Sequence, residues 1–474
     1  MTETAVLWFR RDLRLIDSHA MYALEQWLQE DDSRKWIAFF HIEEKRIEDP
    51  CPHHDYFFQN LEAFSNECKE KNIRLYIKVG EIGQVFESLG KEKEISAVFF
   101  NEDEVPHAVK RDEKARKGLS NAVFYPFKDA HFHASDEVLK KDESYYEVFT
   151  PYYRNWFKKQ KDKPFQIDID FLISRQINKA FTDKEGRDSL INYNKKAETK
   201  WEKVQEQDAL DRLDAFADDP VEYYEKERDI LAEDGTSRLS AYLKTGRISV
   251  RTIYQALLPK LEEDDKGAGT FLSELAWRDF YNMIHVSHPD LKNKELKEAY
   301  QSLNWENNKS NLNKWKNAET GYPVVDACMI QLNETGWMHN RGRMITASFL
   351  VKDFLEDWRE GEQYFGRRLI DYDPSSNAGG WQWAASTGSD AVPYFRVFSP
   401  IRQSQRFDEK GEFIKKYLPV LKDVPERFIH EPWKMSEEEQ EKASCIIGKD
   451  YPEPAVDHSI QRKRAIAMFK GEDE

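Results

Sequence analysis

The segment from Phe271 to Met283 carries side chains that could hold a ligand. An acid, an arginine and two aromatic residues recur at i, i+3, i+4 and i+7, which places them on one face of a helix. They are Glu274, Trp277, Arg278 and Tyr281. The residues that would face the core of the same helix are Leu272, Leu275, Ala276 and Met283. The polar face looks like a ligand surface, although a surface ion cluster packed by aromatic rings would use the same residues.

A second candidate is the helix start at Asp234–Ser240, which reads DGTSRLS. Residues Ala241–Lys244 continue it with a helical pattern. Hydroxyls and backbone N–H groups at a helix start bind anions, and Arg238 adds positive charge, so a diphosphate would fit there. An ordinary Ser/Thr cap is the alternative. The sequence has no G-x-G-x-x-G, Walker A or H-E-x-x-H motif, and Gly267–Thr270 is expected to start a helix.

A third segment, Trp337–Trp358, also has a helical pattern. It places Asn340 and Met344 one turn apart on one face. Arg341 and Arg343 lie beside that face. The sequence therefore predicts polar and basic groups along one side of this helix.

Tryptophan is concentrated in one part of the chain. Seven of the 13 fall between Phe271 and Asp390, at positions 277, 305, 315, 337, 358, 381 and 383. Two of them end the carboxylate- and glycine-rich stretch Asp371–Trp383, which we expect to be a polar loop that binds a ligand. Such a cluster suits aromatic stacking and one-electron transfer, although most buried tryptophans are simply core.

These segments need a scaffold, and the N-terminal part predicts an α/β one. Apolar or β-rich runs occur at Val6–Phe9, Trp36–Ile42, Ile73–Val79, Ala97–Phe100 and Ala122–Phe127. Helical patterns lie between them, at Ala20–Leu28, Asp55–Glu70 and Ile82–Leu89. Ser18 is placed to cap the first of these helices. Strands that alternate with helices predict a parallel sheet covered on both faces.

Beyond this part the pattern changes twice. Residues 135–200 are polar and irregular apart from an aromatic patch at Tyr145–Tyr153, so we expect a long surface connection docked through that patch. After residue 200 the patterns are helical. We predict an α/β domain over residues 1–134, a connector over 135–200 and a helical domain over 201–474.

The composition fits a globular protein, because 40% of the 474 residues are hydrophobic. No apolar run reaches about 18 residues, so no membrane span is expected, and the acidic start does not resemble a signal peptide. The cysteines, at 51, 68, 328 and 445, form no C-x-x-C pair, which predicts a reducing cytosol. Cys51, His53 and His54 are followed by no second ligand pair, so no metal site is predicted.

The net charge of −16 argues against non-specific binding to nucleic acid. Residues Ala391–Val420 run against this trend, with six Lys or Arg and three Asp or Glu. One basic face is enough for specific binding to DNA, although a solvated surface of mixed charge is the alternative.

Several of these segments resemble motifs of the photolyase/cryptochrome family. The opening Leu7–Asp17, LWFRRDLRLID, is similar to the family's N-terminal signature. Similar to its flavin domain are DGTSRLS, SELAWRDFY from Ser273, TGYPVVDACM from Thr320, TGWMHNRGRMITASFLVKD from Thr335 and NAGGWQWAASTGSDAVPYFRVFSP from Asn377. The resemblance covers essentially the whole chain and is greatest to bacterial class I photolyases of cyclobutane pyrimidine dimers.

The resemblance implies a Rossmann-like α/β antenna domain joined by a long connector to an all-helical domain that binds FAD. The residues implied to bind FAD are Tyr224, Thr236, Ser237, Arg238, Leu239, Ser240, Phe271, Arg343, Asp371, Tyr372, Asp373 and Asn377. Asp371, paired with Arg343, and Asp373 would lie at the flavin ring. Asn377 would face flavin N5.

It also implies light-dependent repair, in which photoexcited reduced FAD passes an electron to a flipped-out pyrimidine dimer. Trp381, Trp358 and Trp305 would relay electrons between the flavin and the surface, in that order. Glu274 would hydrogen-bond the dimer carbonyls. The residues implied to line the lesion pocket or contact DNA are Arg228, Glu274, Trp277, Arg278, Tyr281, Asn340, Arg341, Met344, Trp383 and Gln403.

Two pairs of residues depart from the pattern of the folate-binding members. Where those carry Asn-Glu and Cys-Lys, this chain has Pro106-His107 and Lys292-Asn293. The identity of any second, antenna chromophore stays open, with methenyltetrahydrofolate as the first candidate. The expected partner is UV-damaged DNA, bound by a monomer in the bacterial cytosol.

Three alternatives share this fold. A cryptochrome would use FAD for signalling, but plant cryptochromes carry an acid where Asn377 stands, and no long tail precedes Glu474. A flavin-free DNA-binding protein would lack flavin absorption. Photolyases of 6-4 photoproducts use two histidines as proton donors where this chain has Asn340 and Met344, neither of which is a general acid. His339 would be turned about 100° from that face of a helix, so cyclobutane dimers are the expected substrate.

Overall fold

A computed structural model describes residues 3–471, which form two compact units. The first contains the chain up to Tyr146 together with Thr150–Glu222 and Ser237–Ser287. The second contains Glu147–Phe149, Tyr223–Thr236 and the chain from His288 onward. The division into three parts at residues 134 and 200 stays a prediction.

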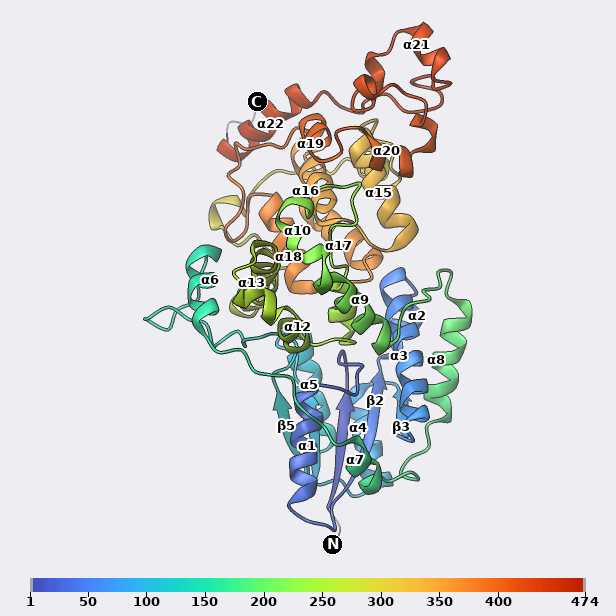
Figure 1. Ribbon diagram of the computed structural model, residues 1–474, viewed down its shortest axis with the longest axis vertical. Coiled ribbons are helices and arrows are strands. Elements are labelled where there is room, and N and C mark those ends of the chain that lie inside the picture. The colour runs from blue at the N-terminus through green and yellow to red at the C-terminus, as the bar shows by residue number, and fades with distance from the viewer. Residues whose placement is uncertain (1–2, 472–474) are drawn as a thin grey trace. The chain divides into compact units, whose positions relative to one another are not determined.

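The first unit is built on a five-stranded parallel sheet with strand order β3-β2-β1-β4-β5 (Figure 1). The strands are β1 (Thr4–Phe9), β2 (Lys35–Ile42), β3 (Leu75–Val79), β4 (Ala97–Asn101) and β5 (Val123–Phe127). All five predicted strands are confirmed, and the central pairing puts Val6 opposite Ile37 and Val98.

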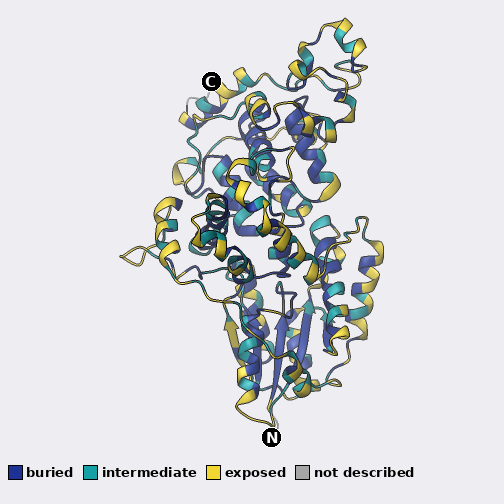
Figure 2. Cartoon of the chain, in the orientation of Figure 1, coloured by how far each residue is buried: buried dark blue, intermediate teal, exposed yellow. Residues whose placement is uncertain are grey.

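Helices cover both faces of this sheet because its central strand is apolar on both sides. Ala5, Leu7 and Phe9 belong to one buried cluster, and Val6 and Trp8 belong to another. The first cluster is completed by α1 (His19–Gln29) and α3 (Pro52–Glu70). The second is completed by α4 (Ile82–Glu92) and α5 (Pro106–Gly118). Figure 2 shows the central strands as continuously buried, whereas the edge strand β5 is largely exposed.

The predicted cap of the first helix is present. The Ser18 side chain accepts a hydrogen bond from the Met21 N–H at the start of α1. Gly267–Thr270 likewise lies in the first turns of α13 (Lys266–Ser287), as expected. A short helix, α2 (Glu44–Glu48), follows β2.

The prediction of an irregular connection over residues 135–200 is wrong. This stretch contains α6 (Phe149–Lys158), α7 (Ile169–Arg175) and α8 (Lys184–Lys196). Helix α7 buries only Leu172, and α8 buries only two large side chains, Leu190 and Tyr193, among many charged residues. Their apolar stripes are therefore too sparse to stand out in the composition. The aromatic patch contributes the first half of α6, from Phe149 to Tyr153.

The remainder of the first unit is helical. It comprises α9 (Glu206–Asp218), α11 (Ser240–Thr245), α12 (Val250–Glu262) and α13. Helix α10 (Pro220–Glu227) lies where the chain passes between the two units.

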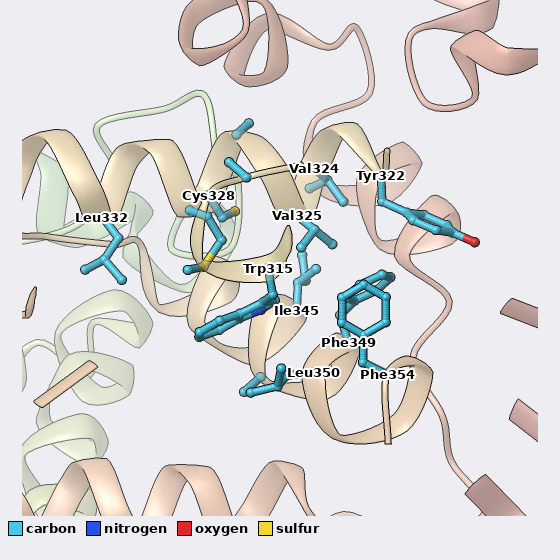
Figure 3. Close-up of a cluster of buried hydrophobic side chains, with 14 of the residues drawn as sticks. Trp315, Tyr322, Val324, Val325, Cys328, Leu332, Ile345, Phe349, Leu350 and Phe354 are labelled. Atoms are coloured by element: carbon cyan, nitrogen blue, oxygen red, sulfur yellow. The ribbon is translucent and has the colours of Figure 1, made fainter. Parts of the chain in front are cut away.

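The second unit is helical, as predicted for the chain after residue 200. Its helices are α14 (Lys309–Lys316), α15 (Pro323–Thr335), α16 (Asn340–Ser348), α17 (Trp358–Arg368), α18 (Pro374–Ala384), α19 (Pro400–Phe407), α20 (Glu412–Tyr417), α21 (Glu437–Lys442) and α22 (His458–Lys470). Single turns supplement them at η1 (Glu298–Tyr300), η2 (Phe349–Asp353), η3 (Pro419–Leu421), η4 (Glu426–Phe428) and η5 (Pro432–Lys434). Figure 3 shows part of its core, where Trp315, Cys328 and Leu350 meet.

Two predictions about this unit need correction. The helix expected over Trp337–Trp358 is interrupted: α16 ends at Ser348, a π turn covers Phe349–Asp353, and Trp358 begins α17. The polar loop expected over Asp371–Trp383 is mostly helix α18. Its start is fixed because the Asp373 carboxylate accepts the Ser375 and Ser376 N–H groups and Pro374 occupies the first position.

All four cysteines are buried, and none of them forms a disulfide. Cys51 and Cys68 lie in the first unit, and Cys328 and Cys445 lie in the second. Between residues 3 and 471, no helix is long and apolar enough to cross a membrane.

Candidate functional site

Helix α13 presents the four-residue face that its spacing predicts. Leu272, Leu275, Ala276 and Met283 are buried. Glu274, Trp277, Arg278 and Tyr281 are all partly exposed. The Trp277 ring lies 5.4 Å from that of Tyr281. An acid, a base and two rings are thus available on one side of the helix.

A buried acid fixes the orientation of this helix. Asp279 is 2% exposed, and its Oδ2 accepts Trp156 Nε1–H at 2.9 Å and the Phe132 and His133 N–H groups at 3.1 Å. Burial raises the pKa of Asp279 to about 6. The preceding residue, Arg278, donates to the carbonyl of Ala130. These contacts tie residues 130–133 and α6 to the helix that carries Glu274.

The segment Ser237–Ser240 has the geometry of a helix start. Ser237 Oγ accepts the Leu239 N–H, and the carbonyl of Ser237 accepts Arg212 Nε–H at 2.7 Å. Arg238 adopts a left-handed backbone conformation with φ +53°, and Ser240 then begins α11. Phe271, on α13, packs its ring 4.9 Å from that of Phe216.

Within the second unit, Tyr224 and Arg228 lie together near the end of α10. The guanidinium carbon of Arg228 is 5.8 Å from the centroid of the Tyr224 ring. Thr236 belongs to the same unit. The roles predicted for these three residues toward FAD and DNA stay predictions.

A set of anchored polar groups surrounds the start of α18. Arg343 NH2 lies 2.8 Å from Asp371 Oδ2, so the expected ion pair is present, and Arg343 Nε donates to the carbonyl of Met338 at 2.8 Å. Asp371 is only 7% exposed. Asp373 is engaged in capping α18. Two carboxylates and a guanidinium are therefore held within a short stretch.

Asn377 is held by an acid that the sequence analysis did not single out. Its Nδ2 donates to Glu362 Oε1 at 3.0 Å and to the Glu362 carbonyl at 3.1 Å. Tyr372 Oη donates to the same Oε1 at 3.2 Å and accepts from Lys292 Nζ at 2.7 Å. Burial and the Glu362 carboxylate raise the pKa of Tyr372. Because both Asn377 N–H contacts go to Glu362, its amide orientation is fixed.

Asn340 and Met344 lie one turn apart on α16, as expected, with Asn340 Nδ2 3.9 Å from Met344 Sδ. Arg341 forms an ion pair with Asp229 at 2.7 Å, and its guanidinium lies 4.3 Å from the Phe407 ring. His339 precedes the helix as its cap, and its Nδ1 accepts the Arg341 N–H. It is therefore held by capping, and the prediction that placed it within the helix is wrong.

Trp383 and Gln403 are partly exposed. The Trp383 ring lies 6.3 Å from that of Phe398. Gln403 Oε1 has no hydrogen-bond donor among residues 3–471. Arg402 and Arg406, its neighbours on α19, are exposed.

Trp305, Trp358 and Trp381 belong to one buried apolar cluster. Trp358 is fully buried, Trp381 is 2% exposed and Trp305 is 7% exposed. The Trp381 ring packs 5.0 Å from Phe365. It also touches the backbone at Gly361, where a Cβ atom would lie 2.0 Å from the ring. The glycine therefore permits the close approach of α17 and α18.

The residues around α18 fit a flavin. Gly380 lies beside the buried Gly379 and Trp381, yet apart from its chain neighbours and its own helix backbone no atom lies within 4 Å of where its Cβ would be. This leaves open space next to Asn377, on the helix that Asp373 caps. A ring with both hydrogen-bond donors and acceptors suits the amide and carboxylates there.

Three residues that hold candidate site residues in place were missed from the sequence. Glu362 and Glu295, whose Oε1 accepts the Trp358 indole N–H at 3.2 Å, are acids in charged surroundings, so no pattern marks them. Asp279 did leave a signal, because it falls on the otherwise apolar face of α13 with Leu272, Ala276 and Met283.

Comparisons with known proteins match both units. A family model described as DNA photolyase covers residues 5–168, and one described as the FAD binding domain of DNA photolyase covers residues 271–471. A deoxyribodipyrimidine photo-lyase of Alkalihalophilus pseudofirmus is 49% identical over 99% of this chain and 98% of its own.

Solved structures agree. A bacterial class III photolyase from Agrobacterium tumefaciens is 31% identical, with a TM-score of 0.89 over 99% of this chain and 98% of its own. An archaeal photolyase from Sulfolobus tokodaii, described with two FAD molecules, is also 31% identical, with a TM-score of 0.80 over 99% of this chain and 100% of its own.

Proposed function

This chain belongs to the DNA photolyase family, and we propose that it is a deoxyribodipyrimidine photo-lyase, a carbon–carbon lyase that splits cyclobutane pyrimidine dimers in UV-damaged DNA with light. The observation that carries this proposal is the 49% identity to a deoxyribodipyrimidine photo-lyase over almost the entire length of both chains. The anchored groups around α18 support it.

The chain's own residues would hold and orient FAD. Arg343 holds Asp371 in place through their 2.8 Å contact. Glu362 turns the Asn377 amide so that its oxygen remains available to a ligand. Tyr224 and Thr236–Ser240 would bind the phosphate and ribitol region. When bound and reduced, FAD supplies the light-excited electron that opens the dimer.

The lesion would be bound outside the base stack. A damaged base pair is poorly stacked, so extruding the dimer costs less there than at an intact step. Trp277 and Trp383 offer aromatic faces to the extruded bases, and Glu274 offers a hydrogen bond to their carbonyls. Arg228, Arg278, Arg341 and Gln403 would meet the flanking DNA.

The side chains on α16 favour cyclobutane dimers over 6-4 photoproducts. Repair of the latter must also move a hydroxyl group, which calls for a proton donor. Asn340 and Met344 are not acids, and the Nδ1 of His339 is engaged with the Arg341 N–H. A cyclobutane dimer needs only electron transfer in both directions, so this pocket suffices.

We further propose a second, light-collecting chromophore and a monomeric enzyme. Methenyltetrahydrofolate remains the first candidate for that chromophore. The residues that replace the folate pattern are engaged otherwise: Lys292 donates to Tyr372, and the carbonyl of Asn293 accepts from Arg359. The absorption of the purified protein before and after removal of flavin identifies the second chromophore, and its sedimentation gives the oligomeric state.

The central experiment compares two lesions in otherwise identical oligonucleotides. We expect the chemically reduced protein to repair the cyclobutane dimer in the light and not in the dark. Repair of the 6-4 photoproduct at a comparable rate would contradict the assignment. Flavin absorption and photoreduction without repair of either lesion would indicate a cryptochrome. Absence of flavin would indicate a DNA-binding protein.

A further inference from the structure

The indole of Trp358, the middle tryptophan of the proposed relay, is hydrogen-bonded to a carboxylate. Trp358 is fully buried, and its Nε1–H donates to Glu295 Oε1 at 3.2 Å. Glu295 is itself only 4% exposed. Little water lies between this carboxylate and the buried ring to screen its charge. The electrostatic interaction between the two is therefore strong.

A guanidinium lies on the face of the same ring. The Arg359 guanidinium carbon is 4.9 Å from the Trp358 centroid, and Arg359 NH2 lies 2.6 Å from Glu295 Oε2. Arg359 also donates to both carboxylate oxygens of Asp357, at 2.9 and 3.0 Å. Two carboxylates and one guanidinium thus leave a net charge of about −1 around Trp358.

Trp381 has different surroundings. Its Nε1 is buried and has no hydrogen-bond acceptor in the described part of the chain. Its ring packs against Phe365 at 5.0 Å, Trp315 at 6.0 Å and the backbone of Gly361. A ring that loses an electron becomes a cation, and apolar surroundings stabilise a cation poorly.

We propose that Glu295 is a positioning residue of the relay, because its carboxylate stabilises positive charge on Trp358 and so draws that charge away from Trp381. In this step one electron leaves the Trp358 indole for the oxidised Trp381 ring. No covalent bond breaks, and the indole proton stays in the hydrogen bond to Glu295. Trp305 replaces the electron, and an external thiol reduces Trp305. The inference rests on the proposed function, since light drives the relay only if a flavin is bound.

Three variants separate charge from structure. Glu295→Gln keeps the size and the acceptor but removes the negative charge, leaving the guanidinium on the ring face. Arg359→Gln removes the opposing positive charge. The double variant restores the net charge of the wild type. Trp381→Phe removes the first member of the relay, so it gives the background yield of tryptophan radical and the background rate of photoreduction. Flavin content and melting temperature are measured for each protein.

The readouts are the yield and lifetime of the tryptophan radical after a laser flash, and the rate of flavin photoreduction with a thiol present. We expect Glu295→Gln to lower the radical yield roughly tenfold, the effect of one lost charge-assisted contact. Arg359→Gln should match or exceed the wild type, and the double variant should recover most of the lost yield.

Equal yields in Glu295→Gln and the wild type would overturn the inference. So would a double variant lower than either single variant, because that result indicates a structural effect. If Glu295→Gln does not fold, a fall in yield for Arg359→Gln is the overturning result. The proposed function is tested separately, by dimer repair with chemically reduced wild-type protein, so the two failures are distinguishable.

Discussion

At the residue scale, the groups proposed to act are oriented by acids behind them. Glu362 holds Asn377, and Glu295 holds Trp358. Arg343 holds Asp371 in the same way with a positive charge. Each acting side chain therefore has a partner that limits its rotation, which is what a site needs if it is to be organised before its ligand arrives.

Glu274 gives the most direct test at this scale. Glu274→Ala should slow dimer repair by roughly one to two orders of magnitude, since a hydrogen bond to a charged intermediate is worth about 1–3 kcal/mol. The measurement is the repair rate of prereduced protein at saturating DNA. Glu274→Gln is the matched control, because its amide N–H can still donate to a dimer carbonyl and should retain most of the rate. An alanine variant as fast as the wild type would remove Glu274 from the mechanism.

A site residue could be predicted from the sequence only where it belongs to a motif or is implied by the family resemblance. Arg343 lies within a segment that resembles a family pattern, and the resemblance implied its pairing with Asp371, so this pair was expected. Glu362 and Glu295 belong to no such pattern, because an acid in a charged helix looks the same whether it faces solvent or a buried amide. Only the fold shows which of them is buried.

At the scale of elements, α13 is the part whose orientation matters most. It carries Glu274 and Trp277 on one side, and Asp279 anchors the other side to Trp156 and to residues 132–133. Rotation of this helix would break three hydrogen bonds to one carboxylate oxygen. The orientation of the proposed ligand-binding face is therefore fixed by hydrogen bonds on the opposite face of α13.

The anchor predicts a specific pH dependence of stability. Burial raises the pKa of Asp279 in the folded protein to about 6, above its ordinary value of 3.8. A raised pKa means that the folded state binds the proton more tightly, so this contribution to stability is lost as the pH rises from about 4 to 6. The loss for this group amounts to about 3 kcal/mol.

Asp279→Asn removes this dependence while keeping an oxygen for the three N–H donors. Relative to the wild type, the variant should gain stability as the pH rises from 4 to 6, and the difference should level off above 6. Urea unfolding at several pH values measures it, with Asp279→Ala as a control that loses the hydrogen bonds at every pH. Parallel curves for the wild type and the asparagine variant would contradict the assignment.

Elements were predicted well where their apolar pattern was dense. The strands of the sheet are buried on one or both faces and appear as continuous apolar runs. Helices α6 to α8 bury few side chains each and were missed. Helix α18 was taken for a loop because its glycines and Asp373 are typical of turns, whereas the acid caps the helix and Gly380 leaves space beside it.

At the scale of the whole molecule, a protein of net charge −16 is proposed to bind a polyanion. The exposed Arg396, Arg402 and Arg406 supply local positive charge. We expect the affinity for damaged duplex to fall steeply between low and moderate salt. Removing one arginine that contacts phosphate should flatten the log–log slope by about one. Filter binding across a salt series measures it, and a slope unaltered by Arg402→Gln and Arg406→Gln would place these residues away from the DNA.

The rate at which the buried cysteines are alkylated can report local unfolding in each of the two units. Burial raises the pKa of both Cys68 and Cys328, so little thiolate is present in the native state to attack an alkylating reagent. Two thiols lie in each unit. Modification at each position, followed by peptide mass spectrometry, therefore reports when that unit opens. The order in which the four cysteines are alkylated during mild denaturation shows whether the first unit, which contains the sheet, or the second unit unfolds first.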